Sequence, residues 1–458
     1  MRKLKELLKN KEKKKFMRQV KPILSLILLI FCGNVFAQST VLTKEEAIQR
    51  TLENNFGIQR SNNLVEIADN NQGILNSGYL PSVTANAGAN YNNEDIEAQF
   101  QEGEARNLNG AETKRYNASL NLNYTLFDGL GRFYTYKQLK EQYKLTKLEA
   151  RETIENTILQ LMSVYFEVAR LTENVGVLNE TLEISKQRIT RAQYQFDYGQ
   201  TSRLGILNAE VDVNNDSITL LNTQQQLENT KRDLLVILNE PQKDLRSIAI
   251  DTTINFLSEL EIENFIKTSN LNNVSLLQAE SNLQITDYDI KVSRSGYLPS
   301  LGLTGSYGWN NSNLPSTSFV QTNTSRGYSA GLNLTWNLFD SGRTITNVKN
   351  ASIRFENQQY LKEQIILEVK RDIANSWGNY QNKRYIYEVQ EKNVITNEDN
   401  FNRSQEQFKL GQISSIEFRQ AQTNLLNART NKNLAKYDAK LAELQVLQLT
   451  GQLLNLEL

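Results

Sequence analysis

Two hydrophobic patterns divide the chain, one with a period of two residues and one with the period of a helix. Four segments alternate apolar and polar residues almost without fault, which places the two sets on opposite faces of a β-strand. They predict strands over about residues 80–91, 115–127, 298–309 and 327–339. Each strand is about 10 residues long, enough to cross a bilayer when tilted.

The polar faces of these strands carry small uncharged residues, and aromatic residues gather near the strand ends. In the strand over 115–127, for example, Tyr116 and Leu120 alternate with Asn117 and Asn121. A membrane barrel with a wet lumen and interfacial aromatic girdles has this pattern, although a soluble β-sandwich also alternates. Four strands cannot close a barrel, and lipid does not tolerate an open edge. A membrane barrel therefore requires several copies of the chain, with three or more expected.

Proline-free stretches of helical periodicity follow each pair of strands. Residues 133–198 and 344–409 predict two helices of 66 residues, each about 100 Å long. Shorter helices are predicted over residues 43–78, 202–238, 272–295 and 414–450. Two short helices stacked end to end match the length of one long helix, so each long helix is expected to lie beside two short ones. Pro81 and Pro299 are expected where a helix gives way to a strand, since proline ends a helix.

The whole pattern occurs twice. The motif Gly-Tyr-Leu-Pro-Ser occurs at 78–82 and again at 296–300, and Leu-Phe-Asp occurs at 126–128 and again at 338–340. Such repetition indicates a duplicated structural unit of about 200 residues. The chain is therefore predicted to contain a first repeat over 38–238, a linker over 239–271 that lies midway along the helices, and a second repeat over 272–458.

The N-terminus predicts a secretory signal peptide over residues 1–37, with residues 1–16 as a possible upstream extension if Met17 is the true start. A basic stretch precedes an apolar run that is too short to span a bilayer permanently. Val35 and Ala37 provide the small residues expected before a cleavage site. Cys32 raises the alternative of a lipoprotein, but bulky Phe31 before it favours cleavage after Ala37 and an unacylated chain.

Composition narrows the function further. Residues 1–37 hold ten Lys or Arg and two Glu, so the remaining chain has 41 basic and 49 acidic residues, a net charge of −8. This balance argues against nucleic acid as a partner. The chain has no His, and its single Cys is Cys32, so the mature protein can have no disulfide, no Cys or His nucleophile and no His-ligated metal. An enzyme built only from carboxylates, Lys, Ser and Tyr stays open as an alternative. No active-site motif is visible, and the sequence predicts a non-enzyme without metal or cofactor.

The duplication, the Leu-Pro-Ser strand entries, the Leu-Phe-Asp strand exits and the glycine helix turns resemble the TolC family of outer-membrane efflux proteins over residues 41–452. The resemblance implies a mixed α/β homotrimer in the bacterial outer membrane, with a twelve-stranded barrel in lipid and a twelve-helix barrel in the periplasm. It implies a passive exit duct of a tripartite efflux or type I secretion system, which meets a periplasmic adaptor and an inner-membrane transporter. The alternative is a membrane-anchored structural or adhesive trimeric coiled coil without transport.

The resemblance also implies acidic rings at a periplasmic mouth that closes where the helices turn. Glu417 matches one acidic position, Gln420 stands one helical turn later, and Gly205 is the equivalent of Glu417 in the first repeat. The plainer interpretation of Glu417 is a solvated carboxylate beside the N-terminal dipole of a helix.

A closed state held by a Tyr and an Arg that reach an Asp is a further implication of the resemblance. Phe408, Ile413 and Gly205 occupy those places here, so this polar lock is expected to be absent. Apolar packing of Phe408 and Phe196 is then the expected restraint on the mouth, unless another pair of residues replaces it.

The resemblance places the adaptor contacts around the two helix turns. The candidate residues are Tyr198, Gly199, Gln200, Thr201, Ser202, Leu410, Gly411, Gln412, Ile413 and Ser414. The two glycines are primarily a geometric requirement of the turns. The polar residues Gln200, Ser202, Gln412 and Ser414 are therefore the better candidates for direct contact.

Overall fold

The computed structural model describes residues 41–101, 103–245, 248–316 and 318–455. The helices are α2 (Lys44–Asn54), α3 (Phe56–Gln72), α4 (Gly131–Asp197), α5 (Arg203–Ile237), α6 (Glu259–Asn272), α7 (Val274–Ser295), α8 (Arg343–Lys409) and α9 (Ser415–Leu449). The strands are β1 (Val41–Leu42), β2 (Ser82–Gln99), β3 (Ala105–Asp128), β4 (Ala249–Ile250), β5 (Ser300–Asn313) and β6 (Thr322–Thr335). The signal peptide expected over 1–37 lies outside the described residues.

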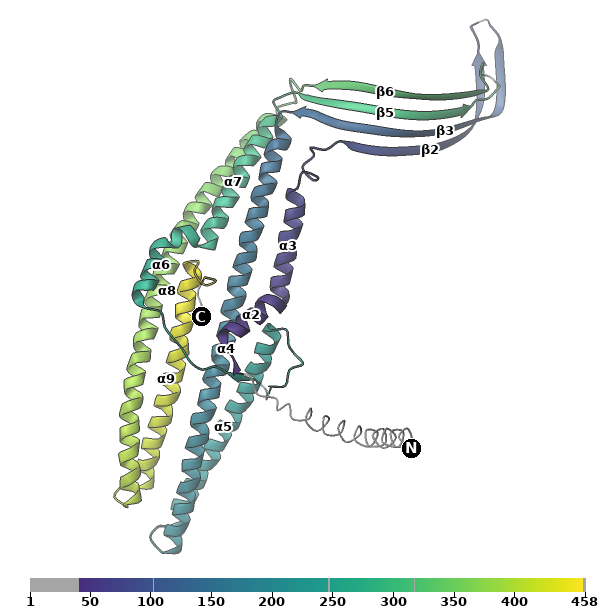
Figure 1. Cartoon of the computed structure of the whole chain (residues 1–458). Coiled ribbons are helices and arrows are strands. Elements are labelled where there is room, and N and C mark those ends of the chain that lie inside the picture. The colour runs from purple at the N-terminus through teal and green to yellow at the C-terminus, as the bar shows by residue number, and fades with distance from the viewer. Residues whose placement is uncertain (1–40, 102, 246–247, 317, 456–458) are drawn as a thin grey trace, which may run out of the picture.

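The molecule is a long, narrow wall of helices with a β-sheet at one end (Figure 1). Helices α4 and α8 run the whole length of the wall. In the half nearer the sheet, the neighbours in order are α3, α4, α7 and α8, and in the far half they are α5, α4, α9 and α8. Each long helix therefore lies beside two shorter stacked helices, as the length arithmetic predicts.

The sheet is antiparallel with the strand order β2-β3-β5-β6. Its register aligns the apolar positions of neighbouring strands in common rows, because Leu120 of β3 lies opposite both Ala85 of β2 and Tyr307 of β5. Tyr307 in turn lies opposite Tyr328 of β6. The alternation seen in the sequence thus becomes one apolar face and one polar face of a continuous sheet.

The strand ends differ from the sequence prediction. Strands β2 and β3 continue through most of residues 92–114, beyond the expected strand ends at 91 and 115. Beyond Tyr91 most residues on both faces of the hairpin are polar, so regular alternation no longer marks the strands. Strand β6 ends at Thr335 rather than at 339. The matching segment of the first repeat is paired, with Tyr124 opposite Leu303, but residues 336–339 have no partner strand within the described chain.

The helix expected over 43–78 is two helices. Asn55 has an extended backbone with ψ of 125°, and its side chain accepts hydrogen bonds from the backbone N–H groups of Gly57 and Ile58. One residue therefore ends α2 and caps α3. Helix α3 then ends at Gln72, well before Pro81, so Pro81 does not end a helix but lies directly before β2. Pro299 lies directly before β5, shortly after the end of α7.

The segment over 239–271, expected to be a linker, also contains structure that periodicity did not show. Strand β4 pairs in parallel with β1, and α6 begins at a capping box between Ser258 and Glu261. That Ser-x-x-Glu spacing is the sequence signal that could have identified α6. We call β1 and the described residues of 239–272 the belt, which packs at mid-height (Figure 1).

Buried polar bonds attach the belt to the wall. Glu443 of α9 is fully buried and accepts hydrogen bonds from Lys440 Nζ at 2.6 Å and from the backbone N–H of Leu257 at 3.1 Å. Tyr380 of α8 donates to the same carboxylate at 3.2 Å. On α4, the Tyr165 hydroxyl donates to the backbone oxygen of Leu42 in β1 at 2.7 Å. These bonds hold the belt on one face of the wall, whereas Asn156 and Ser163 on the opposite side of α4 are exposed.

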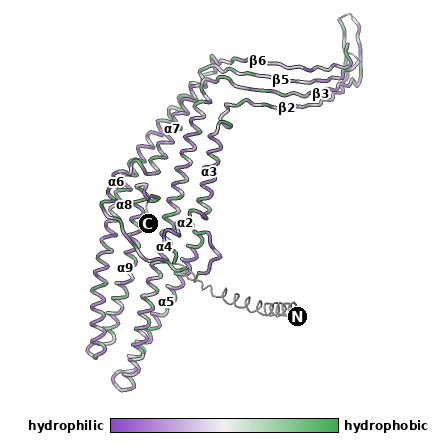
Figure 2. Tube along the Cα trace, in the orientation of Figure 1, coloured by the Kyte–Doolittle hydropathy of each residue, from purple (hydrophilic) through white to green (hydrophobic). Residues whose placement is uncertain are grey.

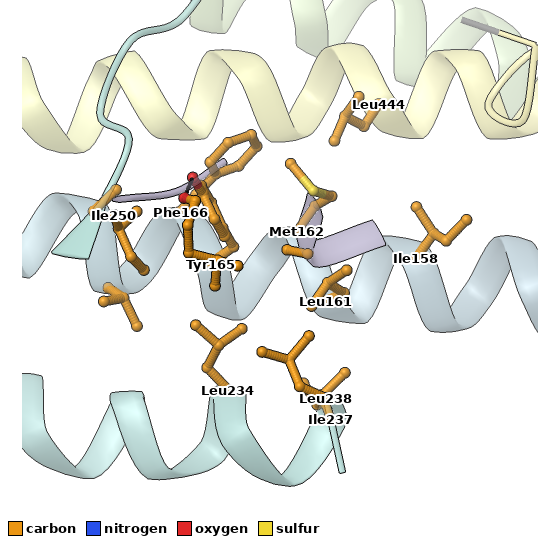
Figure 3. Packing of buried hydrophobic residues seen from close by; sticks show 14 of the residues in the cluster. Ile158, Leu161, Met162, Tyr165, Phe166, Leu234, Ile237, Leu238, Ile250 and Leu444 are labelled. Atoms are coloured by element: carbon orange, nitrogen blue, oxygen red, sulfur yellow. Dashed lines mark hydrogen bonds between the residues drawn. The ribbon is translucent and has the colours of Figure 1, made fainter. Parts of the chain in front are cut away.

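The largest apolar cluster also lies at mid-height, where α4, α5 and α9 meet the belt. Figure 3 shows Met162, Phe166 and Leu444 between α4 and α9, and Leu234 on the other side of α4, where α5 packs. Along α9, nine apolar residues from Phe418 to Leu449 follow one another at intervals of three, four or seven and form a coiled-coil seam. All but Leu449 are buried: Phe418, Ala421, Leu425, Ala428, Ala435, Ala439, Ala442 and Val446. Many of these residues are alanine, so neighbouring helices approach closely.

Hydrophilic residues interrupt every described helix along its length (Figure 2). None of the described helices is both long enough and apolar enough to cross a membrane.

Candidate periplasmic mouth and docking turns

The first helix turn has the hydrogen bonds of a Schellman motif. The backbone N–H of Gln200 donates to the oxygen of Gln195 at 2.7 Å, and that of Gly199 donates to Phe196 at 2.9 Å. Gly199 has φ of +71°, a left-handed conformation that glycine adopts without a steric penalty. The chain therefore reverses sharply between α4 and α5 at this glycine.

The second turn repeats this geometry between α8 and α9. Gln412 donates to Gln407 at 2.8 Å, Gly411 donates to Phe408 at 3.1 Å, and φ of Gly411 is +74°. A Cβ added at Gly199 or Gly411 would meet no heavy atom within 4 Å. The glycines are thus required by backbone conformation rather than by close packing.

The candidate adaptor contacts surround these two turns. Tyr198 and Leu410, which precede the glycines, are 79% and 71% exposed. The polar candidates are also exposed: Gln200, Ser202, Gln412 and Ser414. Thr201 and Ile413 are half-buried. Both turns therefore present side chains to solvent at the end of the molecule farthest from the sheet (Figure 1).

The two repeats differ immediately after the turns. Ser414 and Glu417 form a capping box, in which the Glu417 carboxylate accepts from the Ser414 backbone N–H at 2.7 Å and from its hydroxyl at 2.8 Å. These hydrogen bonds lower the pKa of Glu417 and keep the exposed carboxylate ionised. At the start of α5, Ser202 makes no such side-chain bond, and Gly205 stands in place of the glutamate.

Gln420, the next gate candidate, lies one turn along α9. It is exposed and donates to the Asn424 side chain at 2.8 Å. The capping box accounts for Glu417 as a helix-terminal residue, which is the plainer of the two interpretations. An acidic ring remains a prediction that depends on how several copies arrange their turns.

The aromatic gate candidates do not contact each other within one chain. Phe408 stacks on Phe418, with ring centroids 4.8 Å apart and planes 8° apart. The Arg191 guanidinium lies 4.6 Å from the centroid of the Phe408 ring, a cation–π contact from α4. Phe196 is 40% exposed near the end of α4. Within the chain, the partner of Phe408 is therefore Phe418 rather than Phe196.

A charged cluster joins the two helical hairpins near the mouth. It consists of Arg188 on α4, Asp212 and Asp216 on α5, and Arg419 on α9. Arg188 lies 2.9 Å from Asp212, and Arg419 makes two hydrogen bonds to the Asp216 carboxylate at 2.7 and 2.8 Å. This bidentate geometry is the strong form of an Arg–carboxylate pair.

Further hydrogen bonds complete the charged cluster. Ser185 of α4 donates to Asp216 at 2.6 Å, and Gln422 of α9 donates to Ser185 at 3.1 Å. Arg188 also donates to the hydroxyl of Ser415 at the start of α9, at 2.9 Å. Burial lowers the pKa of the Arg188 guanidinium, and the Asp212 carboxylate acts in the opposite direction. The hairpin of α4 and α5 is thereby tied to the hairpin of α8 and α9.

The charged cluster is a polar link between the two hairpins, in addition to the apolar packing that the sequence predicts as the restraint on the mouth, and that restraint stays a prediction. Sequence reasoning missed the charged cluster because Arg419 of α9 lies 203 residues from its partner Asp216 in the chain. One signal was present, since Asp216 follows buried Ala209 by seven residues and precedes buried Leu220 by four. A charge within an apolar helical stripe indicates a buried partner.

The described residues contain no group of three or more His, Cys, Asp or Glu that could hold a metal ion. The charged cluster balances two arginines with two aspartates, so its chemistry is that of a structural link between helices.

Comparison with known proteins agrees with this architecture. A family model described as outer membrane efflux protein matches residues 47–240 and 265–452. The outer membrane protein TolC of Vibrio cholerae is 21% identical over 380 residues, which cover 82% of this chain and 83% of the relative. The outer membrane efflux protein BepC of Brucella suis is 20% identical over 440 residues, covering 92% and 89%. The structure of the Campylobacter jejuni CmeC outer membrane channel superimposes with a TM-score of 0.74 at 20% identity, covering 90% and 86%.

Replacing Arg419 with alanine should loosen the mouth. The substitution leaves Asp216, whose side chain is 7% exposed, without its bidentate partner, and loss of one partner of a buried pair costs about 3–5 kcal/mol. Hydrogen exchange should therefore accelerate around 185–190 and 415–422. Arg429→Ala is the matched control, because Arg429 also bridges two helices but pairs with the more exposed Glu180 and Glu398. Equal acceleration in both variants would contradict a special role of the charged cluster.

Proposed function

Because the chain belongs to the outer membrane efflux protein family, we propose that three copies form the passive exit duct of a tripartite efflux or type I secretion system. The protein is located in the bacterial outer membrane. The observation that carries the proposal is that both edges of its sheet and both edges of its helical wall lack partners within the described chain.

The sheet edges support assembly. Strands β2 and β6 each have a neighbour on one side only among the described residues. Their free backbone groups would be unsatisfied in lipid, where only closed barrels are stable. Two copies would supply eight strands, a barrel filled by its own side chains, whereas three copies supply twelve and begin to open a lumen.

The helix edges support the same assembly. Helix α5 carries an apolar seam of Leu204, Leu207, Val211, Ile218 and Leu221. Its members are between 46% and 63% exposed and lie on the side of α5 opposite its buried residues. Intervals of three, four and seven residues are typical of a coiled-coil seam that packs against another helix.

The other edge of the wall has a matching seam on α8. Ile353, Tyr360 and Leu367 follow one another at intervals of seven residues and are exposed. These three residues lie in the half of the wall nearer the sheet, where the edge of the next copy is α3. In the far half, where that edge is α5, exposed Tyr385 and Val389 continue the same side of α8. The α3 and α5 edge of one copy can therefore pack against α8 of the next copy, in the same sense in which β2 would pair with β6. Contacts along both edges would then close three copies into one ring.

The inside of that ring would be the duct. The belt covers only one face of the wall, and a belt placed inside would obstruct the passage, so the uncovered face is assigned to the lumen. On α4 this face includes Gln142, Glu149, Asn156 and Ser163, which are polar and spaced by seven residues. Such a surface keeps a channel wet without binding what passes through it.

The exposed glycine turns are the surface proposed for the periplasmic adaptor, which would connect the duct to an inner-membrane transporter. The energy for export would come from that transporter. The alternative function is a structural or adhesive trimeric coiled coil without transport. A solid coiled coil would fill its axis with apolar side chains, whereas the uncovered face of α4 is polar.

Val211→Asp should disrupt the trimer. The variant places an unpaired carboxylate in each of the three contacts between subunits, and burying such a charge is costly. The mass of the mature protein in mild detergent should shift from a trimer toward a monomer. Leu260→Asp is the control, because Leu260 of α6 is also exposed but lies on neither seam. A monomeric unmodified protein would refute the barrel proposal itself, whereas a fully trimeric Val211→Asp variant would refute the role of the α5 seam.

Glu417→Gln should weaken block of the channel by multivalent cations added from the periplasmic side. If three carboxylates surround the mouth, their loss should raise the half-blocking concentration by about tenfold or more. Glutamine retains capping-box geometry, so the helix start should survive. Glu261→Gln is the control, since Glu261 occupies the same position in the capping box of α6.

The same block should have a defined pH dependence. Hydrogen bonds from Ser414 lower the pKa of Glu417, so its charge is present above this lowered value and disappears only as the pH falls through it. Block should therefore persist below the pH at which an ordinary glutamate becomes protonated. If block by multivalent cations were unchanged in Glu417→Gln, the acidic ring would be refuted and helix capping would be the only role of this residue.

Gly411→Phe should abolish export while the trimer remains intact. A side chain at φ of +74° costs about 1–2 kcal/mol, and the ring would project into the open space in which the adaptor is proposed to dock. Gly103→Phe is the control, because Gly103 has φ of +88° and equally open surroundings at the tip of the β2–β3 hairpin. Export can be measured as the resistance of a host cell to a transported compound. Loss of the trimer in Gly411→Phe alone would show that this turn is required for assembly.

A further inference from the structure

The first turns of α4, next to the sheet, carry exposed lysines beside aromatic rings. The upper pair consists of Lys137 and Lys140. Lys137 Nζ lies 4.7 Å from the centroid of the Phe133 ring, and Lys140 Nζ lies 4.5 Å from that of Tyr136. Each ring lies four residues before its lysine, so both side chains extend toward the start of the helix and the sheet.

A lower pair follows on the same helix. Lys144 lies 3.0 Å from the Glu141 carboxylate, and Lys147 Nζ lies 5.5 Å from the centroid of the Tyr143 ring. Each pair contributes two lysines to the same side of α4, seven residues apart, although the Glu141 carboxylate partly neutralises Lys144. The lower pair lies about 10 Å farther from the sheet, because it follows the upper pair by seven residues of α-helix.

This surface faces outward. Lys137 precedes Ile158 by 21 residues and Tyr165 by 28, and multiples of seven place residues on one face of a supercoiled helix. Ile158 and Tyr165 lie in the cluster that includes Leu42 and Ile250 of the belt. Because the belt is assigned to the outside of the proposed duct, the lysines of the upper pair also lie outside.

The position of the upper pair along the axis of the duct matches the level of the membrane surface. Strand β3 ends at Asp128 and α4 begins at Gly131. Lys137 and Lys140 are therefore about 9 and 14 Å below the start of the helix, and their side chains reach back toward the bilayer. The polar layer of one leaflet is about 5–8 Å thick, so the ammonium groups of the upper pair lie near it while those of the lower pair lie well below it.

The upper pair also has unsatisfied charge. Among the described residues, no carboxylate lies within ion-pair distance of Lys137 or Lys140, although 26 ion pairs are present elsewhere in the chain. A cation–π contact leaves most of the ammonium group open to an anion. Basic residues combined with Tyr and Phe are typical of the bilayer interface.

We propose that Lys137 and Lys140, with Phe133 and Tyr136, bind the phosphate headgroups of anionic phospholipids in the periplasmic leaflet of the outer membrane. Three copies would form a ring of six lysines around the duct where it leaves the bilayer. This ring fixes the height of the barrel in the membrane. The inference rests on the proposed function, because it requires that the sheet lie in the bilayer and the belt outside.

The test is native mass spectrometry of the full mature protein, titrated with phosphatidylglycerol and with phosphatidylcholine of the same chain length. The unmodified protein should retain phosphatidylglycerol preferentially. Because each lysine at an anionic surface contributes about fivefold, K137Q/K140Q should reduce this preference by about thirtyfold. K144Q/K147Q removes the same charge at a lower level and should change it less than about twofold. K137R/K140R should retain the preference.

Three results would overturn the proposal. The first is an equal loss of lipid preference in K137Q/K140Q and K144Q/K147Q, and the second is no lipid preference in the unmodified protein. The third is loss of binding to purified peptidoglycan in these two variants with lipid retention unchanged, which would identify the cell wall as the partner. Trimer mass and single-channel conductance are measured on the same samples. A mass other than that of a trimer, or an absence of channel conductance, counts against the proposed duct. Trimers with normal conductance but no lipid preference count against this inference alone.

Discussion

A wall one helix thick has no interior, and this constraint governs how the chain is held together. Each helix exposes two faces and can bury residues only on its two flanks. The apolar seams are therefore narrow and rich in alanine, as along α9, because small residues let the helices approach closely. At mid-height, where the belt adds a second layer, the chain gains its largest apolar cluster around Tyr165 and Leu444.

The single-helix thickness of the wall also explains why charged groups are buried where structural elements join. Glu443 and Lys440 attach the belt, and Arg419 and Asp216 tie one hairpin to the other. Buried ion pairs add little net stability over apolar packing, but they are specific, since one shift in register leaves a charge unpaired. In a wall of long parallel helices, such pairs oppose sliding of one helix past its neighbour.

The two repeats differ directly after their glycine turns. The backbone geometry of the turns is the same at Gly199 and Gly411, whereas only the second repeat caps its return helix with Ser414 and Glu417. A trimer built from this chain would thus have two kinds of hairpin alternating around the mouth. The charged cluster links these two kinds within each copy, so movement of one hairpin is coupled to the other.

The sequence by itself determined the features that depend on local periodicity. The long helices lie within two residues of their expected bounds, because helical periodicity without proline spans the whole elements. The glycine turns could also be located from the sequence, since a left-handed residue that ends a helix is most often glycine. The duplication then showed that each element occurs twice.

Only the tertiary structure decided the features that depend on a neighbour. Strand β6 ends at Thr335 because residues 336–339 lack the partner that the first repeat provides for Tyr124. Phe408 packs on Phe418, and Arg419 pairs with Asp216, across distances in the chain that no local pattern records. Periodicity specifies which face of an element is buried, whereas the identity of what covers that face is set by the packing of the whole chain.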